Sequence, residues 1–320
     1  MAQFIQRSHE DKSGIRDELI SGLLATQATT SPKYLYDALG SKLFEAICEL
    51  PEYYPTRTET AIFDAHADEI TASVGSGRTM IDLGAGNCAK AARLFPVIQP
   101  AHYVPVDISV DFLRDSVETL QQRFPAMEIT ALGVDFSRPF ALPENVQPQQ
   151  RLFFYPGSSI GNFTPAEARA FLRGLAASCG ADGGLLISVD LVKASDVLDA
   201  AYDDALGVTA AFNLNLLNHI NRELDADFDI RQWRHVGFFN PALSRVEMHL
   251  EARTALTVKW RGGKRDFTAG ERIHTESSYK YTQPQFVALL EESGFTGVRV
   301  WTDPRGWFMV CHARGQRKGD

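Results

Sequence analysis

The chain has 320 residues, of which 44% are hydrophobic and 22% are charged, and its formal net charge is −8 at pH 7. This length can bury a substantial core, and an acidic chain without a strong lysine and arginine cluster is unlike a nucleic-acid-binding protein. Residues 1–20 are polar and charged, which argues against a signal peptide, and no apolar run approaches the roughly 18 residues of a membrane helix.

The four cysteines, Cys48, Cys88, Cys179 and Cys311, are widely spaced and form neither a CxxC pair nor a Cys/His ligand cluster. The spacing therefore predicts no metal site, and it fits a reducing compartment. We expect a cytoplasmic monomer without a nucleic-acid or membrane partner.

The N-terminal region predicts helical pieces over residues 14–50, with breaks at "TTSPK" and "ALGS". The next segment, "LPEYYPTRTE" (residues 50–59), holds two prolines four positions apart, and we expect it to be non-helical. A helix is predicted from Glu59 to about Val74.

Strands and helices alternate after this region. Short apolar strands are predicted at 79–84, 102–107, 128–135, 151–157 and 183–190, each followed by a turn or a helix. The helix after the fourth strand should begin at the N-cap Thr164, with Pro165 in its first turn. This alternation predicts a parallel, doubly wound α/β sheet.

The alternation stops between Lys193 and about Tyr281. This part predicts a helix and then antiparallel strands, with a hairpin turn at Gly262-Gly263. Beyond it come a helix and two strands joined by "DPRG", which should pair antiparallel. This order resembles class I methyltransferases. It predicts a catalytic domain of residues 60–195 plus 284–320, and a second α+β substrate-binding domain of residues 1–59 plus 196–283.

Small and acidic residues mark the ends of the first three strands. Gly84 and Gly86 allow a ligand to approach the backbone, Asp107 can accept from ribose hydroxyls, and Asp135 can accept from an adenine amino group. The pattern lacks a third glycine and so favours S-adenosylmethionine over NAD; no Lys-Ser/Thr pair follows it, which excludes a P-loop. Alternatively, the glycines only close turns. Asp82 is either structural or a partner for a cationic group of the ligand.

The turn "PGSSIGNFTP" (residues 156–165) carries an unusual amount of hydrogen-bonding capacity for a link between a strand and a helix. It follows the fourth strand, at the sheet edge where open α/β sheets place ligands. Asn162 is either a ligand-binding amide or a group that satisfies the start of the next helix.

Taken together, these segments resemble one family, the S-adenosylmethionine-dependent L-histidine Nα-methyltransferases of ergothioneine biosynthesis. The resemblance covers almost the whole chain. It is carried by "YLYDALGSKLFEAICELPEYYPTRTE", "IDLGAGNCAK", "PGSSIGNFTP", "AYDDALGVTAAFN", "RVEMHLEART", "TESSYKY" and "WTDPRGWF". It implies three successive methyl transfers to the α-amino group of histidine, which give hercynine.

The resemblance also implies a role for individual residues. It places three of them at the catalytic centre: Tyr36, Gly157 and Ser159. The implied cofactor-binding residues are Tyr36, Gly84, Gly86, Lys90, Asp107, Asp135 and Phe136. For histidine, the implied residues are Asn162 and Tyr202 at the α-carboxylate, Tyr53, Glu276 and Ser278 at the imidazole, and Met248 in the pocket wall.

An acidic residue suits an imidazole ring, because Glu276 can accept from a ring N–H while Tyr53 or Ser278 serves the other nitrogen. Each residue also has a structural alternative: Glu276 and Ser278 could face solvent, and Tyr53 and Met248 could be packing residues. Two other functions stay open. One is Nα-methylation of another aromatic amino acid such as tryptophan, and the other is a catalytically silent protein that only binds the cofactor.

Overall fold

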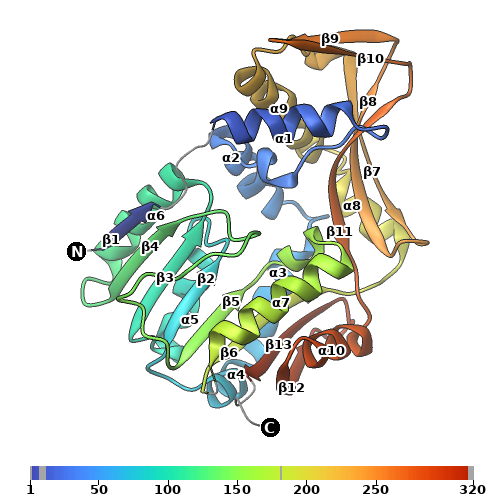
Figure 1. The fold of residues 1–320 in the computed structure, drawn as a ribbon. Coiled ribbons are helices and arrows are strands. Elements are labelled where there is room, and N and C mark those ends of the chain that lie inside the picture. Colours follow the sequence, from blue (N-terminus) through green and yellow to red (C-terminus); the bar gives the residue numbers. More distant parts are fainter. Residues whose placement is uncertain (1, 7–11, 181, 316–320) are drawn as a thin grey trace. The chain divides into compact units, whose positions relative to one another are not determined.

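The computed structural model describes residues 2–6, 12–180 and 182–315 (Figure 1). The chain divides into two compact units. The first holds the N-terminal strand, residues 55–192 and residues 280–315, and the second holds residues 12–54 and 193–279. The expected limits at 59/60, 195/196 and 283/284 differ from this division by three to five residues. The N-terminal strand, expected with the substrate domain, belongs to the first unit.

The first unit is built on an eight-stranded sheet of order β1-β4-β3-β2-β5-β6-β13-β12. All neighbours pair parallel except β13 with β6 and β12 with β13, which pair antiparallel, as the sequence predicts. Its strands are β1 (Gln3–Gln6), β2 (Thr79–Leu83), β3 (His102–Asp107), β4 (Glu128–Gly133), β5 (Arg151–Tyr155), β6 (Gly184–Asp190), β12 (Phe295–Thr302) and β13 (Phe308–Gly315).

Helices cover both faces of this sheet (Figure 1). One core cluster joins the apolar sides of α3 (Tyr54–Ala65), α4 (Ala67–Val74), α5 (Ala89–Ile98) and α6 (Val110–Arg123) to the strands. On the other face, α7 (Pro165–Cys179) packs beside α10 (Gln283–Glu292). The predicted N-cap Thr164 is confirmed, and it forms a reciprocal capping box with Glu167.

Two expectations for the first unit were wrong. Helix α3 begins at Tyr54 rather than Glu59, because Pro55 lies in its first turn, where an N–H has no partner within the helix. The helix also ends at Ala65, and α4 begins at Ala67. Strand β1 was not predicted from its four residues; its parallel pairing with β4 places it at the sheet edge.

The second unit combines helices with two small antiparallel sheets. The helices are α1 (Lys12–Leu24), α2 (Ala38–Cys48), α8 (Ser195–Tyr202) and α9 (Val208–Leu224), with short 3-10 turns η1 (Pro32–Leu35) and η3 (Ile230–Gln232). The sheets are β11-β8-β7, from β7 (Trp233–Asn240), β8 (Arg245–Ala252) and β11 (Arg272–Tyr279), and the hairpin of β9 (Leu256–Trp260) and β10 (Gly263–Phe267). The hairpin turn at Gly262-Gly263 is confirmed; β7 and α8 were not predicted.

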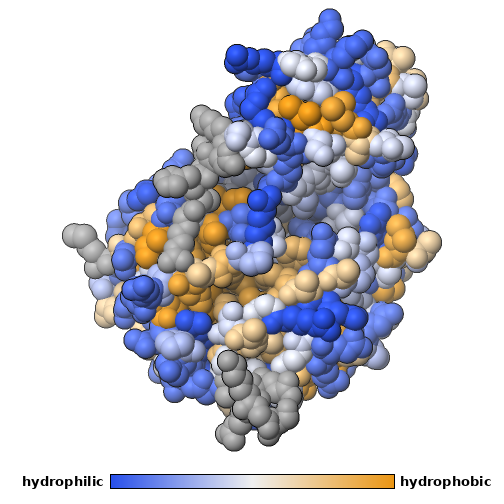
Figure 2. Space-filling view, in the orientation of Figure 1, coloured by the Kyte–Doolittle hydropathy of each residue, from blue (hydrophilic) through white to orange (hydrophobic). Residues whose placement is uncertain are grey.

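The surface is mainly polar. Hydrophilic side chains predominate on the face drawn in Figure 2. Across the described residues, the exposed large hydrophobic side chains come from separate segments: Leu24, Leu39, Val192, Leu206, Ile230 and Leu243. None of the helices in the described ranges has the length and apolar character to span a membrane. All four cysteines are free thiols.

Candidate active site

The glycine-rich turn after β2 is held to the end of β3 by Asp107. Gly84 and Gly86 have φ angles of 72° and 52°, a region that favours glycine. The Gly86 N–H donates to Asp107 Oδ2 at 2.9 Å, and the Ser109 N–H donates to Oδ1 at 2.9 Å. Burial raises the pKa of Asp107, although these backbone donors act against the rise. Each carboxylate oxygen keeps a lone pair for a further donor such as a ribose hydroxyl.

The residues after β4 border the same turn. The ring of Phe136 lies 3.4 Å from the position that a Cβ on Gly84 would occupy, and it meets Tyr155 edge-on at 5.9 Å. Asp135 is half-buried. It accepts two hydrogen bonds from Ser137, one from the backbone N–H at 3.1 Å and one from the side-chain hydroxyl at 2.5 Å. Gly84, Gly86, Asp107 and Phe136 therefore surround one backbone turn at the carboxyl edge of the sheet.

A buried carboxyl lies directly behind this turn. Asp82 is 1% exposed, and Tyr103 donates its hydroxyl to Oδ2 at 2.6 Å. Burial raises the pKa of Asp82 to about 7, against the opposing hydrogen bond from Tyr103. Its Oδ1 atom is buried without a hydrogen-bond partner among the described residues. A carboxylate oxygen that has no hydrogen-bond partner and lies beside a glycine turn suits a cationic ligand group.

The polar turn after β5 is held by a carboxylate that the sequence analysis did not single out. Glu59, on α3, is 1% exposed. Its Oε1 accepts from the Gly157 N–H at 2.7 Å, and its Oε2 pairs with Lys90 Nζ at 2.6 Å. A Cβ on Gly157, whose φ is 77°, would stand 2.9 Å from Lys90 Nζ. The positive φ favours glycine here, and a Cβ would also displace the end of the Lys90 side chain.

The other polar residues of this turn are Ser158, Ser159 and Asn162, and both serine side chains form hydrogen bonds within the protein. Ser158 has a φ of 62°, and its hydroxyl accepts the backbone N–H of Asp190 at 2.9 Å. Ser159 donates to the Pro156 carbonyl at 3.2 Å. Asn162 closes the 3-10 turn η2 (Ser159–Asn162) and is half-buried. It lies outside the Thr164–Glu167 capping box, so Thr164 rather than Asn162 caps α7.

The second unit holds six of the predicted ligand-binding side chains. Tyr202, at the end of α8, and Ser278, on β11, are both buried and join their hydroxyls at 2.9 Å. The Tyr53 ring is 6.3 Å from that of Tyr202 at 66°. Burial raises the pKa of Tyr53 well above its usual value, and Tyr202, Cys48, Tyr36 and Glu276 add to this effect. Tyr53 is therefore a hydrogen-bond donor at neutral pH.

Aromatic rings and the paired strands complete this cluster. Tyr36 meets both Phe44 and Phe212 edge-on at 5.5 Å, and Phe44 meets Tyr53 at 6.1 Å. Met248 on β8 is the cross-strand partner of Glu276, which puts both side chains on one face of the sheet. Met248 and Glu276 are 2% and 8% exposed, so the alternative in which Glu276 faces solvent is excluded.

The predicted residues thus form two groups. Gly84, Gly86, Lys90, Asp107, Asp135, Phe136, Gly157, Ser159 and Asn162 lie in the first unit, and Tyr36, Tyr53, Tyr202, Met248, Glu276 and Ser278 lie in the second. Glu59 and the aromatic residues Phe44 and Phe212 also lie among these residues and were not predicted from the sequence. One signal could have identified Glu59, because Ile62 and Phe63 follow it at helical spacing and are buried.

This sheet, with glycines after β2 and acidic residues at the ends of β3 and β4, is the fold of a class I S-adenosylmethionine-dependent methyltransferase. The profile of the SAM-dependent histidine-specific methyltransferases matches residues 15–315. The chain belongs to this family.

Named relatives agree with this assignment. The chain is 41% identical over 300 residues to the histidine N-alpha-methyltransferase of Mycolicibacterium smegmatis, covering 92% of each chain. It is 39% identical over 300 residues to the Mycobacterium tuberculosis protein of the same name, again covering 92% of each. It is 30% identical over 288 residues to ergothioneine biosynthesis protein 1 of Neurospora crassa, covering 84% of this chain and 31% of that one.

Proposed function

We propose that this methyltransferase transfers three methyl groups, one after another, from S-adenosylmethionine to the α-amino group of L-histidine, and so forms hercynine for ergothioneine biosynthesis. The observation that carries the proposal is the buried cluster of Tyr53, Glu276 and Ser278, a polar set at the positions that the family resemblance assigns to the imidazole. This set offers one carboxylate and two hydroxyl groups, which complement the two nitrogens of an imidazole ring.

The first unit fits the methyl donor. Gly86 leaves open space where a Cβ would stand, Asp107 offers both oxygens to ribose hydroxyls, and Asp135 with Phe136 suits the adenine. The orphaned Oδ1 of Asp82 suits the ammonium group of the methionine part. Bound S-adenosylmethionine supplies an electrophilic methyl group on a sulfonium centre. The protein has to place an amine in line with that methyl group, so positioning is its main contribution.

We assign recognition of the imidazole to residues at its two ring nitrogens. Glu276 accepts from one ring N–H, and Tyr53 or Ser278 serves the other nitrogen. The phenol of Tyr53 stays protonated because of its raised pKa, so it can donate to a ring nitrogen. A ring without polar atoms would offer no N–H to the Glu276 carboxylate, so the hydrogen bond between ligand and carboxylate would be lost, at a cost of about 1–3 kcal/mol. This difference favours histidine over phenylalanine.

We assign the histidine carboxylate to Asn162 and Tyr202. An amide and a phenol can bind a carboxylate without placing a second cation near the sulfonium. Tyr202 has one hydroxyl hydrogen, which points to Ser278 in the structure. When this hydrogen turns to the carboxylate, the Ser278 hydroxyl can donate in the opposite direction and keep the pair joined.

The amine is assigned to the turn at Gly157 and Ser159, with Tyr36 as the third group at the catalytic centre. The first two methyl transfers each release a proton from nitrogen, and the third consumes the lone pair and leaves a permanent cation. Hydroxyl and carbonyl oxygens, such as the Ser159–Pro156 pair, tolerate that cation better than a lysine would. Gly157 also leaves room where a larger residue would meet Lys90.

One experiment tests substrate and extent of reaction together. The purified protein is incubated with S-adenosylmethionine and an equimolar mixture of the twenty amino acids, and the products are followed by mass spectrometry. We expect histidine alone to gain one, two and finally three methyl groups. Methylation of tryptophan instead would reject the substrate assignment. Accumulation of dimethylhistidine as the end product would reject the trimethylation.

We further propose that the enzyme works as a cytoplasmic monomer. The four free thiols support the cytoplasmic part of this proposal, because disulfides are rare in a reducing compartment. Light scattering after size-exclusion chromatography should give the mass of one chain, 35.5 kDa, and a dimer mass would contradict the monomer.

A further inference from the structure

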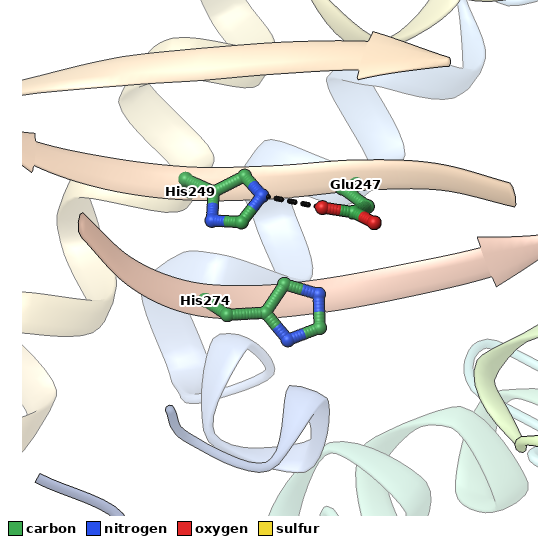
Figure 3. A group of neighbouring side chains, drawn as sticks. All are labelled: Glu247, His249 and His274. Atoms are coloured by element: carbon green, nitrogen blue, oxygen red, sulfur yellow. Dashed lines mark hydrogen bonds and ion pairs between the residues drawn. The ribbon is translucent and has the colours of Figure 1, made fainter. Parts of the chain in front are cut away.

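The three-stranded sheet of the second unit has two different faces. Met248, Glu276 and Ser278, proposed to bind histidine, lie on one of them, since Glu276 pairs with Met248 and Ser278 with Val246. Glu247 and His249 alternate with Met248 along β8 and therefore lie on the opposite face. His274 on β11 is the cross-strand partner of His249 and shares that face. Figure 3 shows these three side chains together on two neighbouring strands.

We propose that Glu247, His249 and His274 form a binding site for one divalent transition-metal ion, such as Zn²⁺, on the sheet face opposite the proposed histidine pocket. Each side chain offers one ligand atom, and these atoms lie within 4.8 Å of one another. Two imidazoles and one carboxylate are a ligand set that such ions prefer, with the remaining position left to water.

The Glu247 carboxylate is already oriented for this role. Its Oε1 accepts from Asn240 Nδ2 at 3.0 Å and from the guanidinium of Arg245 at 2.8–2.9 Å. Its Oε2 faces His249 Nε2 at 2.9 Å, the bond drawn in Figure 3. One oxygen is thus fixed by outer partners while the other points into the cluster, as in metal sites whose ligands are held by a second layer of hydrogen bonds.

His249 has a nitrogen without a partner. The residue is 7% exposed, and its Nδ1 is buried with no hydrogen-bond partner among the described residues. The Phe238 ring stacks on the imidazole at 5.6 Å and 9°, and the His274 ring lies 5.0 Å away. A buried nitrogen lone pair without a donor is costly, and coordination of this nitrogen to a metal ion would relieve the cost.

Both rings have the protonation state that a metal ligand needs. Burial lowers the pKa of His249 and lowers that of His274 to about 4, helped by the neighbouring His249 and Arg245. Burial alone would raise the pKa of Glu247, but hydrogen bonds from His249, Arg245 and Asn240 bring it below its usual value. Neutral imidazoles and an ionised carboxylate are the forms of these side chains that bind a metal ion.

Two features limit the affinity. Arg245 competes for the charge of Glu247, whereas Arg234 and Arg272 are already paired with Glu251 at 2.5 and 2.8 Å. Tetrahedral ligands with metal bonds of about 2.1 Å stand about 3.4 Å apart, so ligand atoms separated by as much as 4.8 Å must approach one another by up to about 1.4 Å. We therefore expect binding in the micromolar rather than the nanomolar range.

The test uses the full-length protein without an affinity tag. The protein is treated with a chelator, and Zn²⁺ is then titrated in competition with a metal indicator. Co²⁺ is titrated separately and followed by its visible absorption. We expect one ion per chain, and at least a tenfold loss of affinity in His249→Gln and in His274→Gln. His66→Gln removes a half-buried histidine of the first unit, beside Glu69, and should leave the affinity unchanged.

Circular dichroism and S-adenosylmethionine binding report whether each variant is folded. If His249→Gln does not fold, Glu247→Gln, which keeps the shape of the side chain, serves as the second variant and should also weaken binding. The proposal is overturned if the wild-type protein binds no ion in a saturable way, or if folded His249→Gln and His274→Gln bind as tightly as the wild type. These readouts do not depend on methyl transfer, so they are independent of the proposed function.

Discussion

The buried carboxylate of Glu59 joins Lys90 to the backbone of Gly157. Lys90 Nζ stands 2.6 Å from one oxygen, and the Gly157 N–H stands 2.7 Å from the other. Helix α3 is thereby connected both to the first residues of α5 and to the polar turn after β5. Two residues of the proposed active site, Lys90 and Gly157, thus depend on a third that contacts neither ligand in the proposal.

We expect the two ends of this ion pair to respond unequally to substitution. The Lys90 side chain is 38% exposed and can reach water, whereas that of Glu59 is 2% exposed. Glu59→Gln keeps an acceptor for Gly157 and should lower the free energy of unfolding by about 1–2 kcal/mol. Lys90→Met leaves a buried carboxylate without its cation and should cost about 3 kcal/mol or more. Urea unfolding measures both values.

The double variant Glu59→Gln/Lys90→Met provides the control for this pair. It removes both charges and should be more stable than Lys90→Met alone, because no uncompensated buried charge remains. Purely additive losses would show that the two side chains do not interact.

Glu276→Gln tests recognition of the imidazole. It replaces a charged acceptor by a neutral amide and should reduce kcat/KM for histidine by about 10- to 100-fold, the effect of losing a charge-assisted hydrogen bond of about 1.5–3 kcal/mol. The dissociation constant of S-adenosylmethionine should not change. Glu251→Gln is the matched control, because this residue lies on the opposite face of the same sheet. Equal losses in both variants would argue against the assigned role.

Asn162→Asp tests the carboxylate site. The two side chains have nearly the same shape, but the new negative charge would face the carboxylate of histidine. We expect KM for histidine to rise by at least tenfold, and by more than in Asn162→Ala, because like charges repel. Asn145→Ala removes an amide that bonds Gln3 and Thr130 in the same unit and should leave KM unchanged. Tighter histidine binding in Asn162→Asp would contradict the proposal.

Asp82 should make the ligand-free protein less stable as pH rises. Its pKa is raised to about 7 in the folded state, so between pH 4 and 7 the folded state holds a proton that the unfolded state has lost. The contribution of Asp82 to the free energy of unfolding is largest below the pKa of the unfolded state. It falls by about 1.4 kcal/mol per pH unit as the pH rises from there to 7. Urea unfolding at several pH values should show this slope in the wild type, and Asp82→Asn should remove it. An unchanged slope in Asp82→Asn would contradict the assignment.

His312 should act in the opposite direction. Burial lowers its pKa to about 4, helped by Arg78, Arg314 and Arg299, and its Nδ1 is 2.7 Å from the Ser73 hydroxyl. In the unfolded state this histidine binds a proton near pH 6.5, whereas in the folded state it stays neutral down to about pH 4. The free energy of unfolding therefore falls as the pH falls from 6.5 toward 4. His312→Gln should flatten the acid side of the stability profile in urea unfolding. If the variant loses stability with acid as steeply as the wild type, another group is responsible.

Much of the fold and one half of the candidate site follow from local patterns in the sequence. The strand ends at Gly84, Asp107 and Asp135 were predictable, because parallel strands bring their carboxyl ends to one edge whatever the helices between them contain. Pro165 and Thr164 likewise mark the start of α7 through the chemistry of a few adjacent residues. The histidine-binding residues came from the family resemblance, since nothing in their spacing indicates an imidazole.

Only the tertiary structure decided which distant side chains meet. Glu59 and Gly157 are 98 residues apart, and no local pattern pairs a helix carboxylate with one particular backbone amide. His249 and His274 become partners because β8 and β11 pair in one register; a shift of a single residue would move one of them to the other face. Strand β1 forms at Gln3–Gln6 because the exposed edge of β4 supplies the hydrogen bonds that so short a segment cannot make alone. The sequence determines local conformation through near neighbours, whereas these contacts depend on how the whole chain packs.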